Sequence, residues 1–253
     1  MEKMRKPFQG VWNIIRFNYQ FYLLAVTVIV GAIFIGRFFG GALQLLLEWV
    51  SVLSAAAIFV SLLVSWYVYD LSELYSLSWL NGLEFPPGKM LNVHAGFDET
   101  SELLKDKFHL QDLRVFDFYD PEKHTEISIR RARKVYPPFP GTERVTTATL
   151  PGDDESFAVF FVILAAHEIR NEKERIAFFR ELRRLLQNDG RIIVTEHLRD
   201  VPNFLAYTFG FLHFHAYKTW RRTFNAARLK ISQEKKVTPF ITTFILEKDG
   251  IAN

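Results

Sequence analysis

The chain has 253 residues, of which 49% are hydrophobic and 23% charged, and it contains 25 phenylalanines and no cysteine. This composition is sufficient for a sizeable core and excludes a disordered or collagen-like chain. The lack of cysteine excludes disulfides, thiolate zinc sites, iron–sulfur clusters and cysteine nucleophiles. A formal net charge of +3 is too small, averaged over the chain, to indicate a nucleic-acid ligand, and we expect none.

Two uncharged runs lie in the N-terminal third, at residues 18–36 and 49–69. Each has about the twenty residues that a helix needs to cross the roughly 30 Å hydrocarbon layer of a membrane. Tyrosines and tryptophans lie near the run ends, where they favour the headgroup layer. The sequence therefore predicts a transmembrane hairpin over residues 18–70. A cleaved signal peptide is the alternative for the first run, but a second span follows it directly.

Basic residues predict the orientation of this hairpin. Lys3, Arg5, Lys6 and Arg16 precede the first span, whereas the connector between the spans has a single arginine. The positive-inside rule places residues 1–17 in the cytoplasm as a basic N-terminus, and two spans return the chain there. We therefore expect a multi-pass membrane protein with both termini cytoplasmic and with membrane lipids as its neighbours.

Residues 71–88 end in Pro-Pro-Gly and predict an interfacial linker, which leaves residues 89–253 as one domain. Strand-like runs in this domain lie at residues 89–93, 113–116, 145–148, 157–166, 192–195, 231–237 and 240–247, and the run at 157–166 is apolar throughout. Helical patterns begin at residue 102 and cover residues 121–134, 171–186 and 219–227. This alternation predicts a doubly wound α/β sheet, and the tight connection between the last two runs predicts an antiparallel pair at its end.

Two stretches carry a resemblance to a known family, LPGDDESFAVFF at residues 150–161 and LLQNDGRIIVTE at residues 185–196. They are similar to the segments that lead into the fourth and fifth strands of class I S-adenosylmethionine-dependent methyltransferases of the type 11 kind. The resemblance covers essentially all of residues 89–253. It implies a Rossmann-like sheet with an antiparallel terminal strand, S-adenosylmethionine as the cofactor, and methyl transfer as the enzymatic activity.

The loop after the first strand departs from the family pattern. The family has an acidic residue and three glycines there, which let the backbone approach the cofactor. In this chain Asn92, His94, Gly96 and Asp98 occupy those four places, so one glycine remains. The resemblance implies that these residues, together with Ala95, contact the cofactor.

Two further residues are assigned to the cofactor by the resemblance. Asp117 ends the second strand and matches the family's ligand of the ribose hydroxyls, a role for which a carboxylate that accepts two hydrogen bonds is suited. Leu150 begins the segment that leads into the fourth strand.

Histidines and carboxylates follow other strands at the same edge of the predicted sheet. His167 and Glu168 come after the fourth strand, and His213 lies in an aromatic stretch able to fold over this edge as a lid. Methyl transfer to a hydroxyl needs a base, and we expect His167 or Glu168 to take the proton, with His213 as the second candidate. A zinc or iron site made by His94, His167 and Glu196 is the alternative use of these side chains.

Residues 203–222 are aromatic and are followed by basic residues, which suits an apolar acceptor at an anionic leaflet. We therefore predict a membrane-anchored methyltransferase of the bacterial inner membrane. Its acceptor would be a lipophilic small molecule such as a quinone precursor, a polyene or a lipid headgroup. Two alternatives stay open: a membrane-anchored binding or regulatory protein that keeps the fold without the chemistry, and a metal-dependent enzyme. The sequence predicts no oligomeric state.

Overall fold

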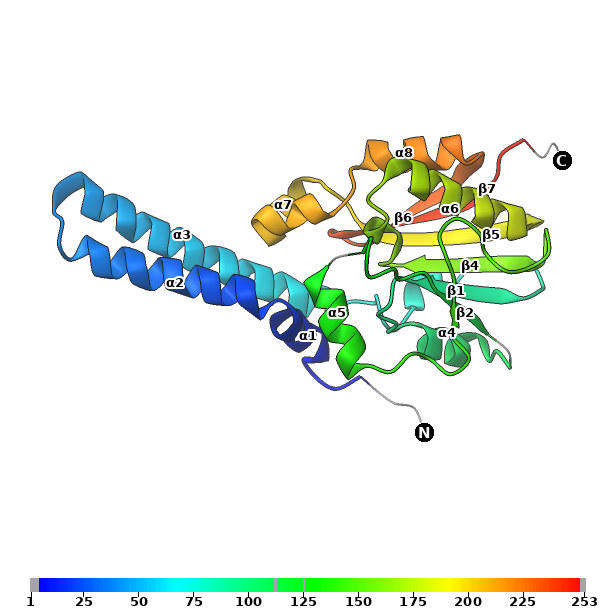
Figure 1. Ribbon diagram of the computed structural model, residues 1–253, viewed down its shortest axis with the longest axis horizontal. Coiled ribbons are helices and arrows are strands. Elements are labelled where there is room, and N and C mark those ends of the chain that lie inside the picture. The colour runs from blue at the N-terminus through cyan, green and yellow to red at the C-terminus, as the bar shows by residue number, and fades with distance from the viewer. Residues whose placement is uncertain (1–4, 112, 125, 251–253) are drawn as a thin grey trace.

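A helical hairpin projects from one end of an α/β domain in the computed structural model, which describes residues 5–111, 113–124 and 126–250 (Figure 1). The hairpin consists of α2 (Tyr19–Gly36) and α3 (Gly41–Trp66), and a short helix, α1 (Gln9–Phe17), lies at its base. Lys3, one of the residues used to predict the orientation, lies outside the described residues.

Both hairpin helices are long and apolar enough to cross a membrane. The second candidate span runs from Gly41 to Leu71, because α3 continues into the π-helical turn η1 (Tyr67–Leu71). Only 11% and 6% of the two apolar windows are buried inside the protein. The open end of the hairpin meets the domain, so α1 and the α/β domain lie at the same end (Figure 1).

Seven strands form one mixed sheet in the order β3-β2-β1-β4-β5-β7-β6. The strands are β1 (Met90–His94), β2 (Arg114–Asp117), β3 (Glu143–Arg144), β4 (Phe157–Ile163), β5 (Leu186–His197), β6 (Leu229–Thr238) and β7 (Ile241–Lys248). The first five pair in parallel, and β7 is antiparallel to both β5 and β6. The doubly wound sheet with an antiparallel terminal strand, predicted from the sequence, is confirmed.

Helices cover both faces of this sheet, which explains why β4 is buried at all seven positions. On one face, α6 (Glu172–Leu185) and α8 (Tyr217–Ala226) contribute Phe179 and Trp220 to the main core. On the other face, α4 (Ser101–Phe108) contributes Leu104 to a second core. The remaining helices are α5 (Ile127–Val135) and the short α7 (Val201–Tyr207), which lies beside the hairpin (Figure 1).

Several element boundaries differ from the sequence expectation. The third strand is the short pair Glu143–Arg144, ahead of the expected residues 145–148, and α5 begins at Ile127, six residues later than expected. The fifth strand begins earlier, at Leu186, because residues 187–190 form a bulge between two stretches that pair with β4. Apolar periodicity does not reveal such a bulge, since its residues are polar and lie outside the repeating pattern.

The segment 71–88, which the sequence predicts as an interfacial linker, contributes to the domain core. Leu74, Leu77, Trp79 and Leu80 are all buried, the last two in the 3-10 turn η2 (Ser78–Leu80). Leu77, Trp79 and Leu80 pack with side chains of β2, β4 and β5 on the face that also holds α4. The core of the α/β domain therefore begins before residue 89.

The α1 helix is fastened through Asp70 to η1, the turn that continues α3. The Asp70 carboxylate accepts hydrogen bonds from the backbone N–H groups of Gly10 at 2.7 Å and Val11 at 2.9 Å. A carboxylate at these positions satisfies free N–H groups of the first helical turn and interacts favourably with the helix dipole. Close approach requires a glycine, because a Cβ on Gly10 would lie 2.4 Å from the Tyr69 Cβ.

Gly10→Ala is therefore expected to displace α1 and to lower the free energy of unfolding by about 1–3 kcal/mol, the usual cost of overpacking. Thermal unfolding of the detergent-solubilised full chain measures the effect. Gly31→Ala is the matched control, because Gly31 is also helical and a Cβ at this position would have no neighbouring atom within 4 Å. Equal melting temperatures for the two variants would show that α1 does not depend on this contact.

Candidate functional site

Two polar clusters lie at the carboxyl ends of the parallel strands. The first, called the β1–β2 cluster, consists of Asn92, His94, Gly96, Asp98, Asp117, Tyr119, His124 and Arg133. The second, called the histidine–glutamate cluster, consists of Glu126, His167, Glu168, Glu196 and His213. Ligands of open α/β sheets bind at this edge, so both clusters are candidate sites.

Asn92 and Asp98, two of the residues assigned to the cofactor from the sequence, fasten the start of α4. The Asn92 amide donates hydrogen bonds to the Ser101 hydroxyl at 2.8 Å and to the Thr100 hydroxyl at 3.0 Å. Asp98 Oδ1 accepts from the backbone N–H groups of Thr100 at 3.0 Å and Ser101 at 2.9 Å. Both side chains therefore have a structural role in addition to any ligand contact.

His94 lies between two carboxylates. Its Nε2 is 3.9 Å from Asp98 Oδ2, and its Nδ1 is 3.9 Å from Asp117 Oδ1 and accepts a hydrogen bond from the Gly96 N–H. Burial lowers the pKa of His94 and outweighs the two carboxylates, which raise it. His94 is therefore neutral at pH 7, with its proton on Nε2.

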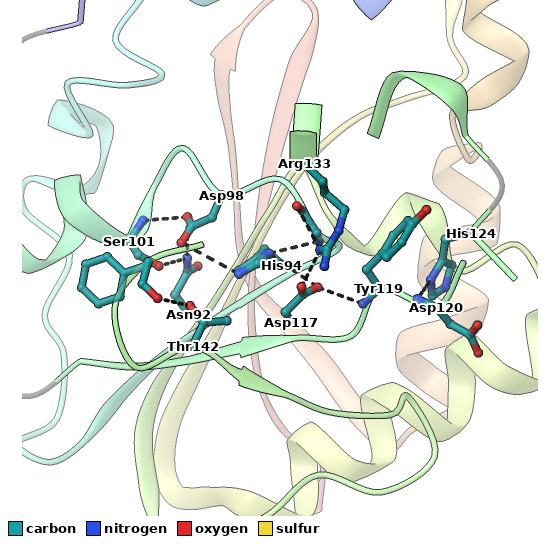
Figure 2. A network of polar contacts seen from close by, with 12 residues as sticks. Asn92, His94, Asp98, Ser101, Asp117, Tyr119, Asp120, His124, Arg133 and Thr142 are labelled. Atoms are coloured by element: carbon teal, nitrogen blue, oxygen red, sulfur yellow. Dashed lines mark hydrogen bonds and ion pairs between the residues drawn. The ribbon is translucent and has the colours of Figure 1, made fainter. Parts of the chain in front are cut away.

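Arg133 pairs with Asp117, the carboxylate that the sequence resemblance assigns to the cofactor ribose. Its Nη1 is 2.5 Å from Asp117 Oδ2 and donates to the Gly96 carbonyl at 3.2 Å (Figure 2). The guanidinium lies over the Tyr119 ring, 4.6 Å from its centroid. A Cβ on Gly96 would lie 2.6 Å from Nη1, so the open side of this glycine faces the guanidinium. Arg133 comes from α5 and keeps 26% of its side chain exposed.

Buried polar atoms without a hydrogen-bond partner gather in the β1–β2 cluster. Among the described residues they include Asn92 Oδ1, His94 Nε2, Asp98 Oδ2, the Tyr119 hydroxyl and His124 Nε2. Each such atom costs about 1–3 kcal/mol if it stays unsatisfied. Together with Asp117 they fit a ligand that carries hydroxyl and amino groups, as S-adenosylmethionine does, provided that Arg133 leaves the carboxylate.

The loop after β1 is covered by α1 and by the segment after the hairpin. Glu99 accepts hydrogen bonds from Arg5 at 2.8 Å and from the Tyr75 hydroxyl at 2.6 Å. Phe17 packs edge-on against Phe97, with ring centroids 5.8 Å apart. The base of the hairpin and the β1–β2 cluster are therefore directly connected.

In the histidine–glutamate cluster, the structure brings together all three side chains predicted to be catalytic. His167 and Glu168 lie in the turn η3 (Ala166–Glu168), and His213 ends the turn η4 (Thr208–His213). Glu168 Oε1 is 3.2 Å from the Nε2 atoms of both histidines. The buried Glu196 holds His167 through its Nδ1 at 2.6 Å and its backbone N–H at 3.1 Å.

These contacts determine the protonation states of the cluster. Burial alone would lower the pKa of His167, but the charge of Glu196 and hydrogen bonds to Glu168 and Glu196 raise it to about 10. Burial alone would raise the pKa of Glu168, but hydrogen bonds from His167 and His213 hold it well below its usual range. At neutral pH, and with no ligand bound to the cluster, His167 is an imidazolium and does not accept a proton.

The metal site predicted from His94, His167 and Glu196 does not assemble. His167 and Glu196 are in contact, but His94 belongs to the β1–β2 cluster, between Asp98 and Asp117. The strand order separates His94 from Glu196, because β1 and β5 lie on opposite sides of β4. Among the described residues, the ligand atoms that converge with His167 are those of Glu168 and His213.

Two other residues assigned to the cofactor, Ala95 and Leu150, are buried. The backbone groups of Leu150 are already bonded, since its N–H donates to Glu181 and its carbonyl accepts from Arg184. Sequence reasoning missed Arg133 and Glu126. Arg133 is one of four cations in the helix sequence ISIRRARKV, and no signal distinguishes it from the others.

Comparisons with solved structures identify the fold of the α/β domain. No family model and no curated protein matches the sequence. The PH0226 protein from Pyrococcus horikoshii OT3 is 16% identical, with 73% of this chain and 92% of that chain covered and a TM-score of 0.53. A chain from the complex between the Haloferax volcanii Trm112 methyltransferase activator and a methyltransferase is 11% identical, with 71% and 91% covered and a TM-score of 0.50. The α/β domain therefore has the Rossmann-like fold found in methyltransferases.

Proposed function

We propose that the chain is a membrane-anchored methyltransferase that uses S-adenosylmethionine and acts on a lipophilic acceptor at the membrane surface. The observation that carries the proposal is the buried Asp117 carboxylate at the end of β2, surrounded by unsatisfied polar atoms. A carboxylate in this place suits the two ribose hydroxyls of the cofactor. When bound, the cofactor supplies a methyl group on a sulfonium, and the protein must align the acceptor with it.

The membrane anchor is supported by the surface of the hairpin. Large apolar side chains along both helices are exposed, and they include Phe21, Leu24, Leu53 and Phe59. A core helix of a soluble protein would bury such side chains, and a signal sequence would account for the first helix alone. Two spans that return the chain to its starting side agree with α1 and the domain lying at one end of the hairpin (Figure 1).

The lipophilic acceptor is supported by the segment that carries His213. Val201, Leu205, Phe209 and Leu212 on α7 and η4 are exposed. This segment lies beside α3, so its apolar surface continues that of the hairpin (Figure 1). An acceptor dissolved in the leaflet would reach His213 along this surface without leaving an apolar environment.

One observation favours a second candidate function. The Arg133 guanidinium lies on the Asp117 carboxylate, where the first candidate requires the ribose. If this ion pair is permanent, the domain is a membrane-anchored binding or regulatory protein that keeps the fold without the chemistry.

Calorimetric titration of the detergent-solubilised full chain with S-adenosylmethionine and S-adenosylhomocysteine tests the first candidate. We expect saturable binding of one equivalent of each ligand. With methyl-labelled S-adenosylmethionine and a total membrane lipid extract, we expect label in the organic phase. No binding of either ligand at millimolar concentration would overturn the cofactor assignment and favour the second candidate.

The anchor is tested separately by washing membranes that contain the full chain with alkaline carbonate. An integral hairpin is expected to stay in the membrane pellet. Release of the chain into the supernatant would overturn the anchor and leave the cofactor assignment unaffected.

A further inference from the structure

His167, Glu168 and His213 present three metal-ligating atoms to one another. The Nε2 atoms of both imidazoles lie 3.2 Å from Glu168 Oε1, and the ligand atoms of the three residues all lie within 4.8 Å of one another. Tetrahedral zinc with bonds of about 2.0–2.1 Å holds its ligand atoms about 3.4 Å apart. We propose that these three side chains bind a divalent transition-metal ion, for which Zn²⁺ is the reference ligand.

The carboxylates behind the two histidines support this proposal. His167 Nδ1 is 2.6 Å from Glu196 Oε2, and His213 Nδ1 is 3.0 Å from Glu126 Oε1. Metal-binding histidines characteristically donate their other ring N–H to a carboxylate, which fixes the ring and directs the free nitrogen at the metal. His167 has this arrangement, whereas His213 Nδ1 lies near the Glu126 carboxylate and is also contacted by the Arg170 guanidinium. Both rings direct Nε2 toward the same carboxylate oxygen.

The charges around this cluster also favour a bound cation. Three carboxylates, those of Glu126, Glu168 and Glu196, surround two imidazoles, and Glu168 and Glu196 are buried. The guanidinium of Arg170 lies beside them, since it contacts the carbonyl and Nδ1 of His213 and is 3.8 Å from Glu126. It contacts the Nδ1 atom of His213, whereas the Nε2 atom of the same ring faces Glu168.

Such an ion would have an open coordination position. Three protein ligands leave the fourth tetrahedral position for water or a substrate, as in catalytic zinc sites. His213 keeps 25% of its side chain exposed and belongs to the apolar η4 segment. The role of the ion rests on the proposed function: it would bind and acidify an acceptor hydroxyl that arrives along this segment.

The test uses untagged full-length protein purified in detergent without a chelator. We expect elemental analysis to find up to one metal ion per chain, and calorimetric titration of chelator-stripped protein with Zn²⁺ to show one saturable site. His213→Gln is expected to weaken Zn²⁺ binding at least 100-fold. Glu196→Gln, which removes a supporting carboxylate, is expected to weaken it by about 10–100-fold.

His109→Asn is the matched control, because His109 is an exposed histidine at the end of α4 with a positive φ that asparagine tolerates. Absorption of Co²⁺ bound to the unaltered chain gives a second readout that does not depend on the folding of a variant. A tetrahedral Co²⁺ spectrum supports the site. No binding of Zn²⁺ or Co²⁺, or equal Zn²⁺ affinity in the His213→Gln and His109→Asn variants, would overturn it and leave the cluster as an ion-pair network. Because no titration contains S-adenosylmethionine, failure of the proposed function would not affect this result.

Discussion

Arg133→Ala is expected to tighten the binding of S-adenosylmethionine by about tenfold or more, whereas Asp117→Asn is expected to abolish it. The guanidinium is 2.5 Å from the Asp117 carboxylate, so the ribose hydroxyls must displace it before they bind. Removing this competitor increases the fraction of chains with a free carboxylate, and a tenfold change corresponds to about 1.4 kcal/mol. Calorimetric titration of each full-length variant measures the affinity.

Arg133→Ala and Asp117→Asn are expected to change the affinity for S-adenosylmethionine in opposite directions, which separates a direct effect on the site from unfolding. A general loss of folding would weaken binding in both variants, and a change of net charge is controlled by Arg130→Ala on the exposed side of the same helix. Arg130→Ala is expected to bind like the unaltered chain. If folded Arg133→Ala protein binds no S-adenosylmethionine at millimolar concentration, Arg133 is not a competitor, and the binding or regulatory function becomes the better interpretation.

The centre of the sheet could be predicted from the sequence because its strand β4 is marked by a continuous apolar run. Residues 157–163 have no polar side chain, as a strand covered on both faces requires, and all of them are buried. The antiparallel end could also be predicted, because β6 and β7 are joined by a connection too short for a crossover. In contrast, β3 has two exposed residues, and no apolar pattern marks it.

The sequence predicted where the candidate site lies, but it predicted only some of the contacts within the site. His167, Glu168 and His213 lie together because η3 follows a central strand and η4 folds back over it, as the order of the elements suggests. The ion pair between Asp117 and Arg133 depends on the rotation of α5 about its axis, which the sequence of a basic helix does not fix. His94 was assigned to a metal site that does not form because the sequence does not reveal the strand order, in which β1 and β5 lie on opposite sides of β4.

The boundary of the domain was the largest difference from the sequence expectation. A proline-proline-glycine stretch at residues 86–88 marks a real change of direction, but the apolar residues before it are too few and too irregular to show helical or strand periodicity. These apolar residues are buried because they cover the part of the sheet face that α4 leaves uncovered. This packing depends on the tertiary structure, so local sequence does not reveal it. Residues 74–80 therefore join the helical hairpin to the core of the domain.

Trp79→Ala is expected to lower the free energy of unfolding by about 3–5 kcal/mol, the usual cost of truncating a buried aromatic residue. Trp79 is 1% exposed, its indole N–H donates to the Leu74 carbonyl at 3.1 Å, and its own carbonyl accepts from Lys235 at 2.8 Å. Thermal or urea unfolding of the detergent-solubilised full chain measures the loss. Trp12→Ala is the matched control, because Trp12 is 60% exposed on α1, and a change below about 0.5 kcal/mol is expected for it. Equal losses in the two variants would mean that residues 74–80 are a linker, and that the domain core begins at residue 89 after all.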